Sequence, residues 1–456
     1  MTVPELVDGV LSFATRPTLV SCALVCKRWS QVALDRLWKQ LDSIFPLLEL
    51  VTSLELLKDI DLCVPEALQT LSDELSEADW SRFHCYADRV RTLSCGYQED
   101  YYPGPTAPKI APEAIAMLCL HHPAGLTLLP HVEVLKWYAG GSAMPMLPFL
   151  SPQVKSLEVE LTGDSHSINC FFHALGGRNL NLRTFALQTP TRAMDIEESL
   201  QKAISTWKNL KTLTVPPYYL RPSILNATSS LPNLTSLHMD YTHHSPYDEA
   251  AVVQKLPENT FPRLRNFSFN CDPVSAQTLV QKYSDLFAGL SKIHISNAGD
   301  INNEDVSRFL RCLGKKCPHL TSLSFNLRPG LEPNREETSP LTFKVLENLF
   351  PCRELEMLEI GHPYPLTLTE ADVERMGAAW PKLVILNTCN EPHPTIPISG
   401  DMGNSLHILS AFAKHLPLME DLGLVFAEEQ VPTFSGDLYP SFEFHTLETL
   451  SVGVST

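Results

Sequence analysis

The feature that most constrains the fold is a pair of apolar residues separated by two others, which recurs from residue 90 onwards. Thirteen copies stand in the chain: Val90/Leu93, Val132/Leu135, Val154/Leu157, Leu182/Phe185, Leu210/Leu213, Leu234/Leu237, Leu264/Phe267, Leu290/Ile293, Leu320/Leu323, Leu355/Leu358, Leu383/Leu386, Met419/Leu422 and Leu447/Leu450. Their spacing averages about 30 residues, which lies within the range of solenoid repeats. The pattern therefore predicts similar units stacked side by side, each in contact with its neighbours.

Each copy has the composition of a short strand, usually with a further apolar residue two positions on, as at Leu187 and Phe269. Amphipathic stretches such as "MDIEESLQKAIST" and "NEDVSRFLRCLGKK" stand between the copies and have helical spacing. Helices that alternate with strands disfavour a β-sandwich or a barrel. We expect an α/β solenoid with its strands on a concave face and its helices outside.

This arrangement resembles leucine-rich repeats, although the match to their consensus is incomplete. The Asn or Cys of the consensus, eight positions after the first Leu, is missing. Those positions hold Pro190, Thr242, Asp272, Arg328 and Pro363. Without that side-chain ladder, we expect an irregular horseshoe of uneven repeats.

The first forty residues have a different pattern, that of three short helices. Apolar residues recur on one helical face from Leu6 to Ala14, a second helix is expected from Pro17 towards Trp29, and a third carries residues from Leu34 to Leu41. A unit this small buries too little surface to be stable alone. Its remaining apolar faces must dock on the rest of the chain or on another protein.

The segment "VPELVDGVLSFATRPTLVSCALVCKRWSQVALDRLWKQL" resembles an F-box, the adaptor-binding module of cullin–RING ubiquitin ligases, and with the repeats it resembles fungal F-box proteins with leucine-rich repeats. One departure is Ala14, where the family usually has a larger apolar residue. The resemblance implies contact with a Skp-type adaptor, and through it a cullin. The residues implied to bind the adaptor or support that surface are Pro4, Leu6, Leu19, Leu24, Val25, Trp29 and Trp38. The alternative is an ordinary three-helix cap of the repeats.

The organisation predicted from these patterns has three parts: an F-box at 1–42, a helical linker and repeat cap at 43–87, and the solenoid at 88–456. The net charge of −17 argues against nucleic acid or an anionic membrane as the main partner. No signal peptide or membrane helix is expected. Scattered cysteines are typical of reduced thiols in a cytoplasmic or nuclear protein.

Motifs for catalysis are missing from the sequence, which contains no G-x-x-x-x-G-K-[ST], G-x-G-x-x-G, G-x-S-x-G, H-E-x-x-H or C-x-x-C. We therefore predict a protein that is not an enzyme and needs no cofactor or metal. Cys119 with His121 and His122, or His243 with His244, are the residues closest to a metal-ligand pattern, but paired histidines in loops are more typical of solvated side chains.

The remaining candidate for function is the concave face of the strands, where residues alternate with the buried ones. The residues expected there are Glu158, Glu160, His238, Asp240, His294, Asn326, Glu359 and Asp421. This set leans acidic and favours a basic or hydrogen-bonding partner, although an average polar surface of an acidic protein has the same composition. Trp137, Tyr138, Tyr218 and Tyr219 are either partner anchors or packing residues.

The predicted function is the substrate-recognition subunit of an SCF-type ubiquitin ligase, whose F-box binds the adaptor and whose repeats bind an unidentified target protein. Two alternatives remain open: an F-box protein that binds its adaptor as a scaffold outside degradation, and a stand-alone repeat binder.

Overall fold

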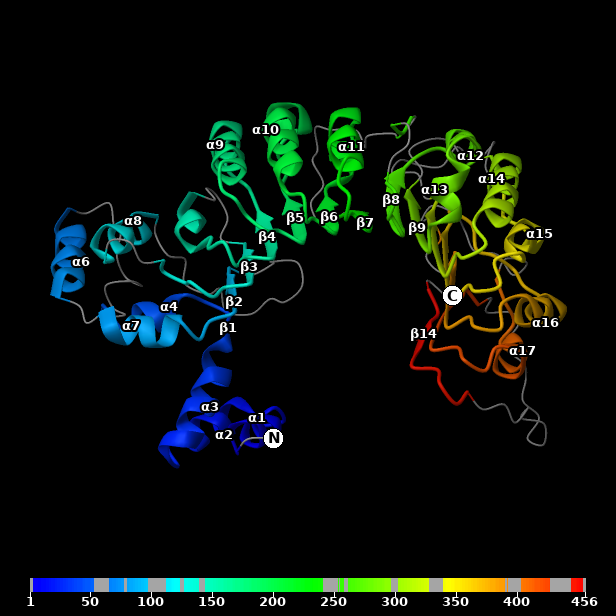
Figure 1. The fold of residues 1–456 in the computed structure, drawn as a ribbon. Coiled ribbons are helices and arrows are strands. Elements are labelled where there is room, and N and C mark those ends of the chain that lie inside the picture. Colours follow the sequence, from blue (N-terminus) through cyan, green and yellow to red (C-terminus); the bar gives the residue numbers. More distant parts are fainter. Residues whose placement is uncertain are drawn as a thin grey trace. The chain divides into compact units, whose positions relative to one another are not determined.

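The computed structural model describes residues 3–52, 65–77, 80–96, 112–123, 127–138, 144–240, 253, 255–257, 261–296, 302–327, 339–389, 392, 403–426 and 444–453. The chain divides into two compact units. Unit 1 consists of Met1–Pro216 with Asp240–Asp248, and unit 2 of Pro217–Met239 with Glu249–Thr456. Figure 1 traces the chain through both.

Unit 1 begins with a three-helix domain formed by α1 (Val3–Leu11), α2 (Arg16–Ala23) and α3 (Lys27–Lys39). The sequence predicted a second helix that reaches towards Trp29, and this is wrong. Leu24 caps α2, and Cys26 is extended, with φ −161° and ψ 164°, so a new helix starts at Lys27. Trp29 therefore lies in the first turn of α3, where it packs against the core of this domain.

Six strands of unit 1 follow one another in parallel, in the order of the chain. They are β1 (Gln40–Leu41), β2 (Thr92–Cys95), β3 (Val134–Trp137), β4 (Ser156–Glu160), β5 (Thr184–Gln188) and β6 (Thr212–Val215). Strand β1 contradicts the expectation that Leu41 continues the third helix. Leu41 is instead a buried strand residue opposite Leu93. The sheet thus starts within the range predicted for the F-box.

The apolar-x-x-apolar spacing follows from the way in which successive strands are joined. The main-chain carbonyl of Arg91 accepts two bonds from the next repeat, from the N–H of Glu133 at 2.8 Å and from the N–H of Val134 at 3.1 Å. Glu133 and Val134 both lie outside the core, between the buried Val132 and Leu135. The carbonyl oxygens of Glu133, Lys155 and Arg183 each accept the same pair of hydrogen bonds from the following repeat.

The helices of unit 1 pack beside one another and against the strands. After α3 they are α4 (Phe45–Leu48), α6 (Pro65–Glu77), α7 (Trp80–Ala87), α8 (Pro112–His121), the 3-10 helix η1 (Met144–Phe149), α9 (Ser165–Gly176) and α10 (Ala193–Thr206). Figure 1 shows α9 and α10 on the same side of β4 and β5. Their core is aromatic: the Phe185 ring lies 4.7 Å from that of Trp207 and 6.4 Å from that of Phe172.

Unit 2 repeats the arrangement with eight described strands, again in chain order and parallel from β7 onwards. They are β7 (Ser236–Met239), β8 (Asn266–Asn270), β9 (Lys292–Ser296), β10 (Ser322–Asn326), β11 (Met357–Gly361), β12 (Ile385–Thr388), β13 (Asp421–Gly423) and β14 (Thr449–Ser451). All thirteen strands predicted from the apolar pairs are present, and the α/β solenoid is confirmed.

Helices alternate with these strands as well. They are η2 (Pro217–Tyr219), α11 (Pro222–Ser229), α12 (Pro273–Lys282), α13 (Ser284–Ala288), α14 (Asn303–Lys316), α15 (Phe343–Leu346), η3 (Glu347–Leu349), α16 (Glu370–Ala379) and α17 (Ile408–His415). In the parts of the chain with a described structure, none of the helices is both long and apolar enough to cross a membrane.

Candidate binding surfaces

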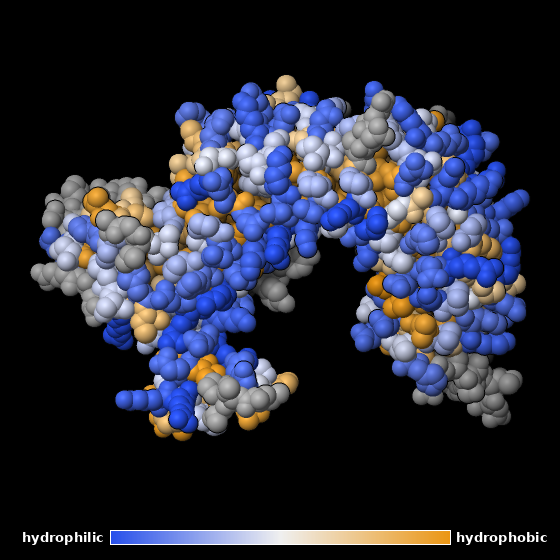
Figure 2. Space-filling model, viewed as in Figure 1, coloured by the Kyte–Doolittle hydropathy of each residue, from blue (hydrophilic) through white to orange (hydrophobic). Residues whose placement is uncertain are grey.

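The three-helix domain places large apolar side chains on its outside because its core is small. The fully buried residues are Leu11, Leu19 and Ala33, with half-buried neighbours that include Val7 and Trp29. In contrast, Phe13 is 91% exposed and Leu24 is 83% exposed. Figure 2 shows orange at the outer edge of this domain among the blue of its charged residues. Apolar side chains gathered on one small domain are typical of a protein–protein interaction site.

The residues predicted to meet an adaptor fall into three groups in the structure. Leu6, Leu24 and Val25 are exposed, at 54%, 83% and 65%. Leu19 is buried and Trp29 is half-buried against the domain core, so both support the surface from within. Pro4 lies in α1, and its side chain is outside the described residues.

Trp38 has a different environment from the rest of the predicted set. Its ring lies 4.4 Å from the ring of Tyr86 in α7, so it packs against the repeat side of unit 1. Arg89 strengthens this junction through an ion pair with Asp35 and a 2.6 Å hydrogen bond from Nη2 to the side chain of Gln31. Trp38 is therefore part of the connection between the three-helix domain and the repeats.

Three exposed apolar residues of this surface were missing from the prediction. Val10 is 65% exposed, and Phe13 and Val20 also face solvent. The sequence pattern places apolar residues from 6 to 14 on one helical face, but in the structure Leu11 points into the core while Leu6 and Val10 point out. The available signal was the spacing of Leu6, Val10 and Phe13 at i, i+4 and i+7, which defines a second stripe beside that of Val7 and Leu11.

The second surface is the face of the strands that does not contact the helices. All eight residues predicted for it are half-buried and alternate with fully buried neighbours, so their placement on this face follows the expected pattern. Glu158, Glu160 and Asp240 belong to unit 1, and His238, His294, Asn326, Glu359 and Asp421 belong to unit 2.

In unit 1 the acidic residues are held by polar neighbours. Glu158 forms an ion pair of 3.0 Å with Lys136, and the side chain of Gln188 donates a 2.8 Å hydrogen bond to Asp240. Burial raises the pKa of Tyr138, and its hydrogen bond with Glu158 and the nearby carboxylates of Asp240 and Glu160 raise it further. The Tyr138 hydroxyl thus stays protonated and available as a donor on an acidic face.

In unit 2 the same face changes in chemistry along the strands. Burial lowers the pKa of His238, as does the charge of Lys292, and burial also lowers the pKa of His294. Further along, one carboxylate oxygen of Asp421 and the side-chain oxygen of Asn387 are buried without a hydrogen bond to any described residue. Buried oxygens without donors favour a partner that brings N–H groups.

The aromatic residues considered as anchors turn out to be packing residues, with one exception. Trp137, Tyr218 and Tyr219 are all buried, and Trp137 stacks on Phe149 at 6.0 Å. Only Tyr138 of the four is half-exposed. Strand alternation accounts for the buried Trp137 and the half-exposed Tyr138, whereas Tyr218 and Tyr219 lie in η2 and are both buried.

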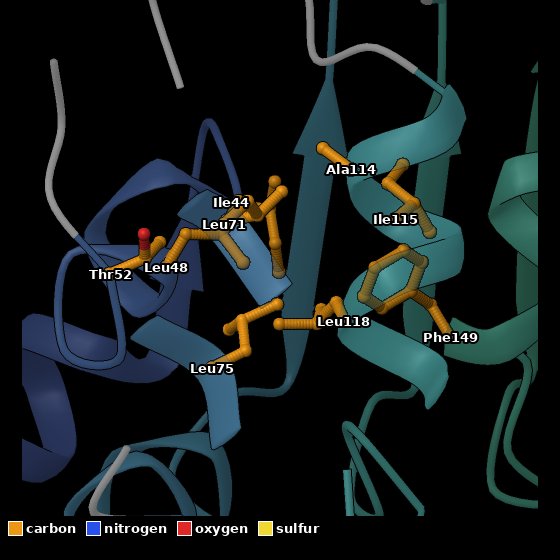
Figure 3. Close-up of a pocket in the computed structure, with 9 residues that line it drawn as sticks. All are labelled: Ile44, Leu48, Thr52, Leu71, Leu75, Ala114, Ile115, Leu118 and Phe149. Carbon is orange, nitrogen blue, oxygen red and sulfur yellow. The ribbon is translucent and has the colours of Figure 1, made fainter. Parts of the chain in front are cut away.

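The apolar cavity of Figure 3 lies between α4, α6, α8 and η1 in unit 1. Its lining residues are Ile44, Leu48, Thr52, Leu71, Leu75, Ala114, Ile115, Leu118 and Phe149. The cavity measures only about 10 Å³, which is the lower limit for a single water molecule. It is therefore a packing gap between these helices, too small for a ligand.

The histidines near residue 120 make contacts that suit packing. His121 Nε2 lies 3.0 Å from the hydroxyl of Ser72, and the ring of His122 lies 5.0 Å from that of Trp80. Among the residues with described positions, no group of three or more His, Cys, Asp or Glu could hold a metal ion. His243 and His244 lie outside the described residues.

Comparison with known proteins gives a family match in the three-helix domain. A family described as F-box-like matches residues 4–43. The search of curated proteins found no match. The chain is similar to a chain of the Rad7 and Elc1 complex of yeast, at 15% identity and a TM-score of 0.45, with 98% of each chain covered.

Two further solved structures are similar to this chain. The leucine-rich repeat-containing protein LegL7 from Legionella pneumophila has 13% identity and a TM-score of 0.35, over 69% of this chain and 87% of that one. A chain of the TLR13–ssRNA13 complex has 12% identity and a TM-score of 0.31, over 78% of this chain and 51% of that one.

The fold and the family match define the class of protein: an α/β solenoid preceded by a small helical domain. More particularly, the chain carries an F-box-like domain at its amino terminus, followed by parallel strands that alternate with helices.

Proposed function

We propose that this chain is the substrate-recognition subunit of an SCF-type ubiquitin ligase. The observation that carries the proposal is the exposure of Leu24, Val25 and Phe13 on a domain that matches the F-box-like family. In the proposed complex these side chains are covered by a Skp-type adaptor, which links the chain to a cullin. The repeats hold a target protein, and the complex works in the cytoplasm, the nucleus or both.

The rate gain in such a complex comes from proximity. A bound target presents its lysines near the charged ubiquitin carrier, which replaces a bimolecular encounter by a nearly unimolecular step. This chain then needs no nucleophile or general base of its own. We expect purified protein alone to transfer no ubiquitin.

The test is a pull-down of a Skp-type adaptor with the intact chain and with the double variant Leu24→Asp, Val25→Asp. The two aspartates should abolish detectable capture of the adaptor, because the interface would bury both charges without a partner. The matched control is Leu450→Asp in β14, where the leucine is 41% exposed in unit 2. This control should bind like the intact chain.

If the intact chain is folded by circular dichroism but captures no adaptor, the proposal is wrong and the helices serve only as a cap. If the adaptor binds, reconstitution with cullin, RING subunit and ubiquitin carrier separates a receptor from a scaffold. A receptor promotes ubiquitin transfer to a protein held by the repeats, whereas a scaffold leaves its partner unmodified.

A further inference from the structure

The residue that comes directly before each strand of unit 1 belongs to one continuous main-chain ladder. The N–H of Arg91 donates to the carbonyl of Lys39 at 2.9 Å, and the N–H of Glu133 donates to the carbonyl of Arg91 at 2.8 Å. The ladder continues with N–H to carbonyl distances of 2.8, 2.6 and 2.8 Å. We call its six members the amino-edge row: Lys39, Arg91, Glu133, Lys155, Arg183 and Lys211.

The amino-edge row is basic although the whole chain has a net charge of −17. Five of its members are Lys or Arg, and the single acid, Glu133, forms an ion pair of 2.7 Å with Lys155. The hydrogen bond from Lys155 lowers the pKa of Glu133, and the charges of Arg91 and Arg183 add to this effect. Basic side chains thus surround Glu133 and cancel its charge.

Solvent reaches most of the row. Lys39, Arg183 and Lys211 are exposed, and Arg91 and Lys155 are half-buried. In the described parts of the chain, neither Lys39 nor Arg183 forms a side-chain hydrogen bond or an ion pair with an acidic residue. Neither cation would therefore have to break a hydrogen bond or an ion pair to meet a ligand.

The positions two residues earlier add no opposing charge. They hold Leu37, Arg89, His131, Gln153, Asn181 and Asn209, and Asn209 donates a 2.7 Å hydrogen bond to Asn181. The equivalent position to the row in unit 2 changes sign along the chain, from Arg265 before β8 to Glu356 before β11 and Glu448 before β14. The basic character is thus a property of the amino-terminal repeats.

We propose that the amino-edge row is a binding site for an extended acidic protein segment, rich in Asp, Glu or phosphorylated side chains. Strands stand about 4.8 Å apart, so six positions span about 24 Å. An extended peptide of about eight residues covers this length. Its carboxylates then meet Lys39, Arg91, Arg183 and Lys211, while Lys155 stays paired with Glu133.

Two observations favour an acidic protein segment over single-stranded nucleic acid. Sites that bind single strands combine basic grooves with aromatic side chains on which bases stack. Of the twelve residues at the row and at the positions two before it, none is Phe, Tyr or Trp, and His131 carries the one ring. The net charge of −17 also repels a long polyanion more than a short peptide.

The experiment uses the full chain, a fluorescein-labelled peptide of about eight glutamates, and fluorescence anisotropy at low and at physiological salt. We expect binding that weakens as salt rises, because exposed ion pairs are screened. The variant Lys39→Glu, Arg183→Glu should bind roughly tenfold more weakly, since two attractions are lost and two repulsions are added. A glutamine peptide of the same length should not bind.

The matched control is Lys315→Glu, Lys414→Glu, which makes the same change in net charge at exposed residues of unit 2. It should keep most of the affinity. No binding by the intact chain, or an equal loss in both variants, would overturn the proposal. Tighter binding of an oligothymidine of equal length, lost only in the row variant, would assign the site to nucleic acid instead.

This site is independent of the proposed ligase role, because the assay contains no adaptor. If the full chain captures the adaptor but does not bind the acidic peptide, only the proposal for the amino-edge row is wrong. A failed adaptor pull-down would leave the row proposal standing.

Discussion

His362, directly after β11, is a titratable residue inside the hydrophobic core of unit 2. Its exposure is 0%, and its Nδ1 accepts a 3.1 Å hydrogen bond from the N–H of Tyr364. Its Nε2 has no hydrogen-bond partner within the described structure. Burial lowers the pKa of His362 to about 4 because the charged ring would lose its hydration.

This burial predicts a loss of stability in mild acid. The unfolded chain binds a proton at His362 near pH 6.5, and the folded chain only near pH 4. The stability that depends on a neutral His362 is therefore fully present above pH 6.5. As the pH drops towards 4, the free energy of unfolding decreases, by about 2 kcal/mol between pH 7 and pH 5. Urea unfolding at these two pH values measures the change.

The variant His362→Asn keeps an acceptor for the Tyr364 N–H and removes the proton uptake. It should show a pH dependence that is shallower by about 2 kcal/mol over the same interval. His319→Asn, at an exposed histidine of the same unit, should behave like the intact chain. An equal pH dependence in the intact chain and His362→Asn would show that the ring takes up its proton over the same pH range in the folded and the unfolded chain.

Helices of unit 2 come close enough to their neighbours to exclude a side chain at two glycines. A methyl group at Gly314 in α14 would overlap the carbonyl oxygen of Asn348 in η3, and one at Gly377 in α16 would overlap that of His415 in α17. Both obstacles are main-chain atoms, which cannot rotate away. Glycine normally weakens a helix interior, so close packing is the reason for it here.

We expect Gly314→Ala to lower the free energy of unfolding by about 1–3 kcal/mol, although alanine is the better helix former. The control is Gly176→Ala in α9, where the added Cβ would lie 3.6 Å from the Cα of Ala203, an ordinary contact. That substitution should be neutral or stabilising by up to about 1 kcal/mol. Equal effects of the two variants in urea unfolding would argue against the tight α14–η3 contact.

At the scale of the whole molecule, stability depends on contacts between successive repeats. Leu358 in β11 pairs in register with Leu323 in β10 and with Leu386 in β12, and all three are fully buried. In repeat proteins each unit is stabilised mainly by its nearest neighbours. A defect should therefore spread locally along the strand order.

The variant Leu358→Ala removes buried methyl groups and should cost about 2–5 kcal/mol. Hydrogen exchange should rise first in β10, β11 and β12, while amides of β4 and β5 in unit 1 keep their protection. A matched exposed site is Leu418→Ala, which should leave exchange unchanged. Uniform loss of protection in both units would mean that the chain unfolds as one cooperative body.

The repeat architecture was predictable because each strand from β2 to β13 has the same two buried positions, as at Leu320 and Leu323. Strand β1 could not be predicted, because it has only two residues and its sequence continues the helical pattern of α3. Motif resemblance located the three-helix domain, but which stripe of α1 faces solvent depends on how Leu11 and Leu19 meet in its core. No sequence signal indicated the burial of His362, which depends on the repeat that packs beside it.

The uniform register has a consequence for how such a chain can change in length. Almost twice as many residues separate Leu93 from Leu135 as separate Leu135 from Leu157, yet all three occupy the same rung of the sheet. The hydrogen bonds of each strand and of the residue before it set the register between repeats. The length of the segment that leads to the next strand can therefore vary. Insertions in those segments add little entropic cost. New recognition elements can therefore be acquired one repeat at a time while the existing strands stay in place.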